Sequence, residues 1–220
     1  MKNSVKLFLI FFCFLCMTCN MINVYAQEQV STSDETTQPT TSTTTANNAQ
    51  TIEVILDRLQ DLPLCLIEKD DRLSYLFPDG VPTSQNEMVK YLTTIEVLTW
   101  TGTEDKTIEL TVHKKLADTY KRIFNELYLM KFPINLASCY CFRTMNNGSG
   151  TDALSHHSYG VALDINWDVN PHIYYGTPDE SSQYYINADV VNVFKSHGFY
   201  WGGDWNDPWT DWMHFTYTDH

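Results

Sequence analysis

The sequence predicts an α+β fold, in which a small antiparallel sheet carries packed helices. One observation is a clear amphipathic helix over 114–130. Another is a pair of runs rich in Thr, Ile and Val, joined by a short turn, that reads as a hairpin over 93–112. Residues 51–220 fall within the usual size of one domain, roughly 100–200 residues, and contain no internal repeat, so we expect a single domain there.

The first 26 residues have the features of a secretory signal peptide. Lys2 and Lys6 give a charged start, an unbroken apolar run follows over 7–17, and small residues end at Ala26. The apolar run is too short to span a membrane. We therefore expect these residues to be removed and the protein to be secreted.

Residues 27–50 are rich in Thr, Ser, Asn and Gln and contain almost nothing apolar. Such a segment cannot bury enough surface to offset chain entropy, so we expect a disordered linker. No later segment contains about 18 uninterrupted apolar residues, the usual signal for a membrane span. The mature protein is therefore expected to be soluble, without a membrane span.

Apolar periodicity predicts a helix over 51–62 that ends at Pro63. A capping box, Ser-Gln-Asn-Glu, begins a short helix that reaches about residue 92. The helix over 114–130 follows the hairpin and is stopped by Pro133. The remaining predicted elements are a buried strand over 136–142, a strand over 161–165, a short helix over 188–196 and a last strand over 212–217.

The charge of the chain limits its partners. The formal net charge is −13, and removal of the signal peptide with its two Lys would make it −15. From Thr151 onward the chain has one Lys, no Arg and ten acidic residues. Nucleic acid is therefore excluded as an expected partner, because phosphate binding depends on Lys and Arg, and an anionic membrane surface is excluded in the same way.

Three cysteines would leave with the signal peptide, and Cys65, Cys139 and Cys141 would remain. An odd number outside the cell allows one disulfide and one free thiol. If Cys139 and Cys141 lie on one strand, they share a face, so we expect a bridge from Cys65 to one of them. Zinc binding by cysteine is not expected, because the mature chain has no CxxC spacing.

Histidines and acids near the C-terminus form a candidate metal centre. His157 and Asp164 lie seven residues apart, and Asp211 lies three residues before His214. Two imidazoles and one carboxylate are a known ligand set for catalytic zinc, which keeps a fourth position open for water. The remaining carboxylate can act as general base. Spacing alone does not choose between His157 and its neighbour His156.

Residues 155–164, SHHSYGVALD, resemble the SxHxxGxAxD motif of the zinc D-alanyl-D-alanine carboxypeptidases and L-alanyl-D-glutamate endopeptidases. Residues 201–205, WGGDW, followed by Asp-x-x-His-Phe over 211–215, resemble the second signature of that family. Residues 140–144 look like the strand end whose Arg precedes the first motif. The resemblance covers about residues 107–220 and implies the hedgehog-type fold of these peptidases.

The resemblance implies a role for each of these residues. His157, Asp164 and His214 look like the zinc ligands, so His156 is expected to point away. Asp211 looks like the general base that later protonates the leaving amine. Arg143 looks like the group that polarises the scissile carbonyl and holds the developing oxyanion.

Other residues have two possible interpretations. Ser155 is expected either to hydrogen-bond a ligand or substrate or to be a turn residue. Tyr159 and Trp201 are expected to line the substrate cleft, although aromatic residues are more often part of a core. Asp204 is expected to orient a ligand histidine or to be a turn acid. His172 is expected to be a surface residue.

These features predict a secreted, monomeric zinc peptidase, extracellular or associated with a cell wall, that hydrolyses peptidoglycan stem peptides. The bond is either L-Ala-D-Glu or the terminal D-Ala-D-Ala. Aspartate at position 211, where many carboxypeptidases have glutamate, and the shortage of cations for a terminal carboxylate favour the endopeptidase. The alternative is a non-catalytic zinc-containing binding module on the same scaffold, as in the hedgehog signalling domain.

Overall fold

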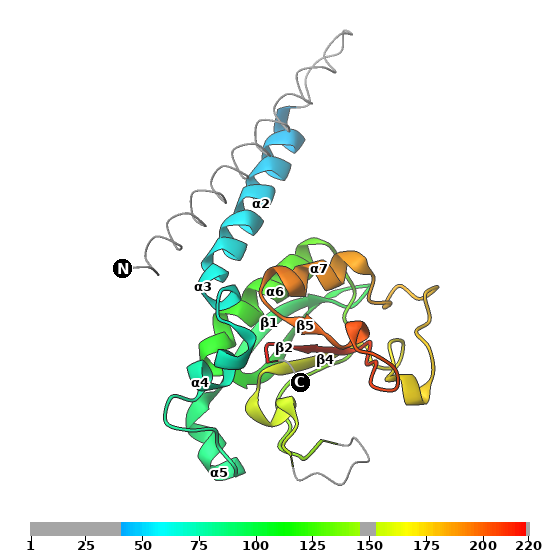
Figure 1. Cartoon of the computed structure of the whole chain (residues 1–220). Helices are drawn as coiled ribbons and strands as arrows, with labels where there is room; N and C mark the ends of the chain where they lie inside the picture. Colours follow the sequence, from blue (N-terminus) through cyan, green and yellow to red (C-terminus); the bar gives the residue numbers. More distant parts are fainter. Residues whose placement is uncertain (1–40, 146–152, 219–220) are drawn as a thin grey trace. The chain divides into compact units, whose positions relative to one another are not determined.

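The computed structural model describes residues 41–145 and 153–218 (Figure 1). The chain divides into two compact units, Met1–Asn47 and Asn48–His220, and the second contains every element below except the start of the first helix. The predicted signal peptide and residues 27–40 of the predicted linker lie outside the described residues. Within the described part, no helix is long and apolar enough to cross a membrane.

Helix α2 (Thr41–Gln60) begins well before the predicted start at residue 51, so it includes residues 41–50 of the predicted linker. The helix ends at Gln60, two residues before the predicted end. Pro63 lies in the first turn of the next helix, α3 (Leu62–Cys65), where its missing N–H breaks no intrahelical hydrogen bond. The short helical segments that follow are η1 (Lys69–Asp71), α4 (Arg72–Leu76), α5 (Gln85–Met88) and η2 (Val89–Tyr91). Ser84 caps α5 as predicted, because its side chain accepts a hydrogen bond from the Glu87 N–H.

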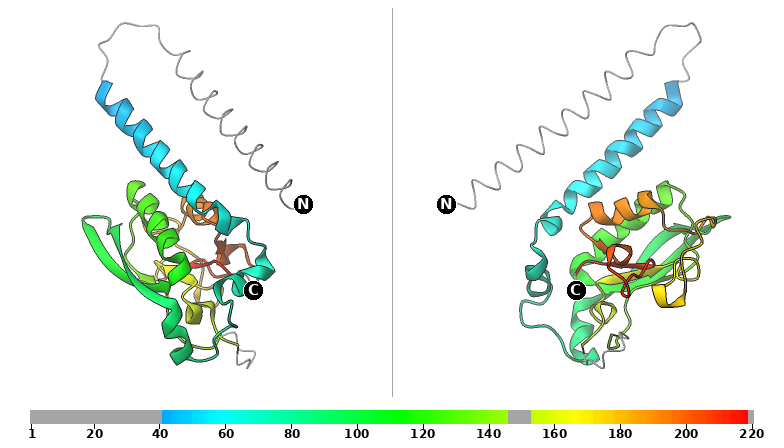
Figure 2. Two further views of the ribbon diagram at one scale, coloured as in Figure 1. Left: turned by 90° about the vertical axis from the view of Figure 1, so that its left-hand side faces the viewer. Right: turned by 45° about the vertical axis from the view of Figure 1, so that its right-hand side comes forward.

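The predicted hairpin is present and forms its own two-stranded sheet. Strands β1 (Leu92–Trp100) and β2 (Asp105–His113) pair antiparallel along their whole length. Alternate side chains of β1 are buried, as expected for a sheet with one face against a core. The 3₁₀ turn η3 (Lys114–Leu116) leads into α6 (Ala117–Leu129), which lies along β1 (Figure 2).

A second, four-stranded antiparallel sheet carries the candidate site. Its order is β3 (Ala137–Ser138), β4 (Ala162–Ile165), β6 (His214–Thr216) and β5 (Tyr200–Trp201). The α+β prediction is therefore confirmed. The predicted strand over 136–142 was too long, because the Tyr140 N–H donates to Thr111 and the Cys141 N–H donates to His157, outside the sheet.

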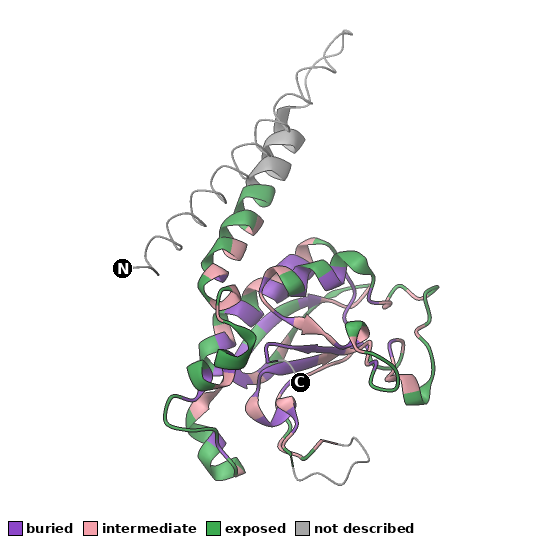
Figure 3. Ribbon diagram, in the orientation of Figure 1, coloured by how far each residue is buried: buried purple, intermediate pink, exposed green. Residues whose placement is uncertain are grey.

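The core lies between the sheets and two helices, α6 and α7 (Ala188–Ser196), and α7 has the predicted bounds. Strands β4 and β6 are almost wholly buried (Figure 3). Phe194 of α7 stacks on Phe215 of β6 with ring centroids 3.7 Å apart. This packing fixes the central strands, and the candidate site residues at their ends are held with them.

A buried cluster of charged side chains joins the N-terminal helices to α6 and to the end of α7. His197 is fully buried; its Nδ1 lies 2.6 Å from Asp61 Oδ2 and its Nε2 lies 2.8 Å from Glu126 Oε1. Arg122 also binds Asp61, and Arg58 Nη2 lies 2.6 Å from Glu126 Oε2. Since both ring nitrogens face carboxylates, both donate and the imidazole is cationic. We call these five residues the buried ion cluster.

Hydrogen bonding in the buried ion cluster outweighs burial. Burial alone would raise the pKa of Asp61 and of Glu126, but the hydrogen bonds from His197 and the arginines lower both. Burial alone would lower the pKa of His197, but its two carboxylate partners raise it. The folded protein therefore favours the charged form of all three groups.

The expected disulfide is absent, since Cys65, Cys139 and Cys141 are all free. Cys139 is buried and its Sγ lies 3.7 Å from the Tyr120 hydroxyl, whereas Cys141 is exposed. Cys65 lies on α3, where its Sγ contacts the carbonyl oxygen of Ser196. The expectation failed because Cys65 and Cys139 have different neighbours, Ser196 and Tyr120. Cys139 and Cys141 also lie beyond the end of β3.

Candidate metal centre and active site

His157 lies in a tight 3₁₀ turn, η4 (His156–Tyr159), that sequence places just before β4. The turn begins at Ser155, whose side chain accepts a hydrogen bond from the His157 N–H. It ends at Gly160, which has the left-handed φ of 65°. A Cβ at Gly160 would lie 2.8 Å from the His113 backbone nitrogen, so both the conformation and the close approach require glycine.

A backbone contact orients the His157 ring. Its Nδ1 lies 2.6 Å from the carbonyl oxygen of Cys139. A carbonyl oxygen can only accept, so Nδ1 carries a proton and donates it. The Nε2 atom of neutral His157 is then left with a lone pair, which is the form a metal ligand needs.

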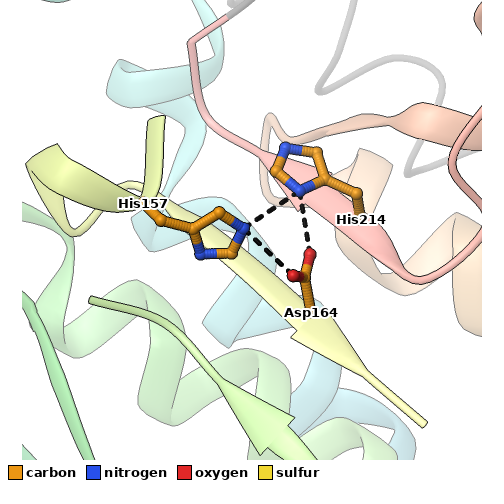
Figure 4. A group of neighbouring side chains, drawn as sticks. All are labelled: His157, Asp164 and His214. Atoms are coloured by element: carbon orange, nitrogen blue, oxygen red, sulfur yellow. Dashed lines mark hydrogen bonds and ion pairs between the residues drawn. The ribbon is translucent and has the colours of Figure 1, made fainter. Parts of the chain in front are cut away.

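Asp164 and His214 face each other across neighbouring strands. They are direct partners in the antiparallel pairing of β4 with β6. His214 Nδ1 lies 2.8 Å from Asp164 Oδ1, and His157 Nε2 lies 3.2 Å from Asp164 Oδ2. Figure 4 shows the two rings and the carboxylate pointing toward one another. The first motif and the second motif thus meet at one point.

The three side chains fit a metal ion by their donor atoms and their spacing. One ligand atom from each lies within 4.8 Å of the others. His157 Nε2 and His214 Nδ1 face each other at 3.2 Å. Two nitrogens that bind one tetrahedral zinc at about 2.0–2.1 Å are separated by about 3.3 Å. The observed separation is close to that value.

The electrostatics of Asp164 and His214 favour a cation, whereas at His157 burial alone would lower the pKa but the Asp164 carboxylate raises it. Burial alone would raise the pKa of Asp164, but the adjacent imidazoles of His157 and His214 hold it well below its usual range. Burial lowers the pKa of His214 despite the neighbouring carboxylate. At neutral pH the group therefore combines an ionised carboxylate with a neutral imidazole at His214, and both are forms that ligate a metal.

Asp211 lies in the turn before β6, close to the metal-ligand group. Its backbone N–H donates to the Gly202 carbonyl, and a Cβ at Gly202 would lie 2.4 Å from the Asp211 carbonyl oxygen. Its Oδ1 is buried and has no hydrogen-bond partner among the described residues. Burial first, and then the charge of Asp164, raise the pKa of Asp211 to about 7. A cation bound beside it would lower that pKa.

Arg143 belongs to a segment that is tied to the η4 turn. Its backbone N–H donates to Ser158 Oγ at 2.8 Å, and its carbonyl accepts from the Ser155 N–H. Burial raises the pKa of Asp211, and Asp164 raises that of His157 against the effect of burial; the positive charge of Arg143 opposes both shifts only in part. The guanidinium Nη1 donates to the Thr144 carbonyl at 3.3 Å, and the predicted role of Arg143 toward a substrate stays a prediction.

The three residues predicted to contact substrate all have structural contacts. The Ser155 hydroxyl caps the η4 turn. The Tyr159 ring packs on Phe77 with centroids 5.5 Å apart, and the Trp201 Nε1–H donates to the Trp212 carbonyl at 2.9 Å. Substrate binding by these residues stays a prediction.

The contacts of His156 and Asp204 decide two further expectations. His156 Nδ1 lies 3.1 Å from Thr216 Oγ1, so this ring does not join the metal-ligand group. Asp204 is half exposed and pairs with Lys195 Nζ at 2.6 Å, so it does not orient a ligand histidine.

Two further residues, His172 and Trp205, lie near the site. His172 was expected at the surface but is only partly exposed, and it forms an isolated antiparallel bridge with Asp211. The Trp205 ring lies 5.3 Å from the His214 ring. For Trp205 the WGGDW run was a signal; for His172 only the three-dimensional pairing identifies the position.

Comparison with known proteins gives one match. A family model described as D-alanyl-D-alanine carboxypeptidase matches residues 149–217, about a third of the chain. The matched segment contains the metal-ligand group and Asp211, and it supports peptidase chemistry. No curated protein and no solved structure matches the chain.

Proposed function

We propose that this protein is a secreted zinc metallopeptidase that hydrolyses peptide bonds in peptidoglycan stem peptides. The observation that carries the proposal is the convergence of three metal-ligand atoms beside a buried, unpartnered carboxylate oxygen. The match of the same segment to a peptidase family supports it. That family is generally zinc-dependent. Secretion rests on the signal peptide predicted over residues 1–26.

The metal ion would be held by His157 Nε2, a carboxylate oxygen of Asp164 and His214 Nδ1. A bound zinc supplies a Lewis acid for the scissile carbonyl and lowers the pKa of water toward about 7. The contact from His157 Nδ1 to the Cys139 carbonyl fixes the ring in the orientation that this role needs.

Asp211 acts as the proton carrier of the reaction. Its unpartnered Oδ1 accepts the proton that the attacking water loses, and the same atom returns a proton to the leaving amine nitrogen. Both transfers occur at one carboxylate, so no second acid is needed. Burial keeps competing water away from Oδ1 and so preserves its basicity.

Arg143 stabilises the negative charge that develops on the carbonyl oxygen. Its backbone is fixed by Ser158 and Ser155, so the guanidinium group is delivered from a rigid segment. A fixed cation interacts most strongly with the negative charge that develops on the carbonyl oxygen in the transition state. It therefore lowers the activation barrier more than it tightens substrate binding.

The internal L-Ala-D-Glu bond is the favoured target. Removal of a terminal D-Ala needs a cation for the free carboxylate, and the last third of the sequence has one Lys and no Arg. That residue, Lys195, already pairs with Asp204. An internal cut needs no such cation. Because the matching family model is described as a carboxypeptidase, the test must distinguish the two bonds.

The test incubates the zinc-loaded full-length protein with purified peptidoglycan fragments and identifies products by mass spectrometry. An internal cut between L-Ala and D-Glu is expected; loss of one D-Ala would instead identify a carboxypeptidase. Asp211→Asn should abolish either product, while Asp204→Asn, a matched change at an exposed acid, should not. Intact fragments with stoichiometric zinc would contradict the peptidase and favour a binding module.

A further inference from the structure

The connection between β4 and α7 exposes aromatic side chains next to the candidate active site. Tyr174 is 69% exposed and Tyr175 is 86% exposed, and both belong to the 3₁₀ turn η5 (Ile173–Tyr175). In Figure 1 this turn, in yellow, lies beside the red loop that precedes β6, and the Ile173 N–H donates to the Thr210 carbonyl of that loop. Exposed aromatic rings at the edge of a site usually mark a binding surface.

The base of this connection is held rigidly, so the exposure of the tyrosines is not a result of poor packing. Asn166 and Asn170 are fully buried. The Asn166 side chain donates to the carbonyls of Pro133 and Tyr184, and the Asn170 side chain accepts from the Ile186 N–H. Buried amides that are fully bonded across a loop fix its two ends. The η5 turn is thus presented on a preorganised support.

His172 connects this turn to the proposed proton carrier. His172 and Asp211 are antiparallel partners, and the flanking bond runs from the Ile173 N–H to the Thr210 carbonyl. A flanking bond of this kind belongs to an antiparallel pair whose two residues are not hydrogen-bonded to each other. In such a pair the two Cα atoms are about 4.5 Å apart, and both side chains lie on the same face of the paired segments. The backbone of His172 is therefore adjacent to that of Asp211, which places the η5 turn beside the loop that carries Asp211.

The rings of His172, Tyr174 and Tyr175 form one aromatic cluster. Their rings are stacked, with centroids 5.2 Å apart and an interplanar angle of 9°, and the Tyr175 ring meets His172 edge-on at 6.4 Å. His172 Nδ1 accepts a hydrogen bond from the Tyr174 N–H. Its proton is therefore on Nε2 when the ring is neutral, and that N–H is left to donate to a ligand.

The charges around the η5 turn exclude an anionic ligand. Residues 167–187 contain no Lys and no Arg. Asp168, Asp179 and Glu180 are all exposed there. Carboxylates accept hydrogen bonds from hydroxyl groups, and the faces of aromatic rings pack against apolar C–H groups. A pyranose ring offers both, since its face presents C–H groups and its edge presents hydroxyls.

We propose that His172, Tyr174 and Tyr175 form a saccharide-binding subsite that takes the amino sugar of the glycan strand from which the stem peptide extends. This inference rests on the proposed function and deepens it. The subsite adjoins Asp211, so the sugar lies close to the bond that is cut. That position suits a cut at the glycan end of the stem peptide and is less suited to removal of its far terminal residue.

The first test measures saccharide binding without any peptide. The full-length protein is titrated with a β-1,4-linked N-acetylglucosamine tetramer and binding is followed by tryptophan fluorescence. The double substitution Tyr174→Ala with Tyr175→Ala should weaken binding by at least about tenfold, whereas Tyr174→Phe with Tyr175→Phe should retain most of it. Tyr75→Ala, at an exposed tyrosine on α4, should bind like the unaltered protein.

The second test compares hydrolysis of a stem peptide that carries its disaccharide with hydrolysis of the same peptide without it. We expect the unaltered protein to have a higher kcat/KM for the disaccharide form by about tenfold, and the double alanine variant to show a ratio near one. Cleavage of both substrates at equal rates, without tetramer binding, would overturn the subsite and leave the proposed peptidase intact.

Two further outcomes separate the subsite from other interpretations. Tetramer binding that is lost in the double alanine variant, in a protein that cuts no stem peptide, would contradict the peptidase but support the saccharide surface. The double alanine substitution could instead weaken binding of a sugar-free peptide with a free amine as strongly as it weakens binding of the disaccharide form. In that case the rings bind a cation, and the saccharide proposal is wrong.

Discussion

The protein contains two clusters of imidazole and carboxylate groups that differ in which groups balance the charge of the carboxylates. In the buried ion cluster, each nitrogen of His197 faces a carboxylate, and each carboxylate also binds an arginine. In the metal-ligand group, His157 Nε2 and His214 Nδ1 face each other at 3.2 Å across a single carboxylate. The first cluster is complete without any added ion, whereas the second has the geometry that a bound cation would complete.

This difference separates a structural cluster from a candidate catalytic one. Histidine near acids is not by itself a sign of metal binding, because the buried ion cluster has the same residue types and is closed to ligands. The informative feature is two imidazole nitrogens aimed at one point together with a further buried carboxylate, Asp211, whose Oδ1 has no hydrogen-bond partner among the described residues. Substitutions in the two clusters should therefore have different consequences.

The largest effect is expected from His214→Ala. Loss of one nitrogen ligand should remove the metal and reduce kcat/KM for stem-peptide hydrolysis by at least about 10⁴-fold, because the chemistry of the metal is lost with it. Product formation followed by mass spectrometry measures the change. The matched change His156→Gln, at a histidine that bonds Thr216, should keep the activity. Equal activity of both variants would remove His214 from the ligand set.

The next effect is expected from Asp211→Asn. The amide cannot carry the proton, so kcat should fall by about 10²–10⁴-fold. The metal should remain bound, because Asp211 is not one of the three converging ligands. Steady-state kinetics together with metal analysis separates the two properties. A variant that loses its metal would show that Asp211 is a ligand and not the proton carrier.

His197→Ala should act on stability instead of chemistry. Removal of the buried imidazolium leaves Asp61 and Glu126 less compensated, and breaking such a buried pair costs about 3–5 kcal/mol. Urea unfolding measures the free energy of unfolding. The folded variant should still bind the metal, since His197 is not part of that group. A change below about 0.5 kcal/mol would show that the buried ion cluster is not a structural support.

The stability supplied by His197 should depend on pH. The pKa of His197 is raised above its ordinary value of 6.5 in the folded protein, so the contribution is fully present below pH 6.5 and is lost as pH rises through the folded pKa. The difference in unfolding free energy between the unaltered protein and His197→Ala should therefore shrink from pH 6 toward alkaline pH. A constant difference would mean that His197 is not charged when buried.

The sequence predicts the elements whose signals are local. The hairpin of β1 and β2 and helix α7 appear where their patterns indicated, since turn residues and apolar spacing act over a few neighbours. The strand expected over 136–142 is mostly absent, because its N–H groups bond to Thr111 and His157, which lie far away in the sequence. Long-range pairing of this kind leaves no local pattern.

The candidate site divides in the same way. His157, Asp164, Asp211 and His214 could be named because each lies in a recognisable motif. The position of His172 could not be predicted, because its pairing with Asp211 joins two loops that have no shared pattern. The buried ion cluster was missed for the same reason, as Asp61 lies 136 residues from His197.

The most direct test is a zinc titration of the unaltered full-length protein against a competing chelator, run beside His157→Ala and His197→Ala. We predict one zinc per chain in the unaltered protein, none in His157→Ala, and one in folded His197→Ala. This result would assign the ion to the metal-ligand group and not to the buried ion cluster. Failure of the unaltered protein to bind zinc, or equal binding by His157→Ala, would contradict the metal centre and the hydrolytic chemistry proposed for it.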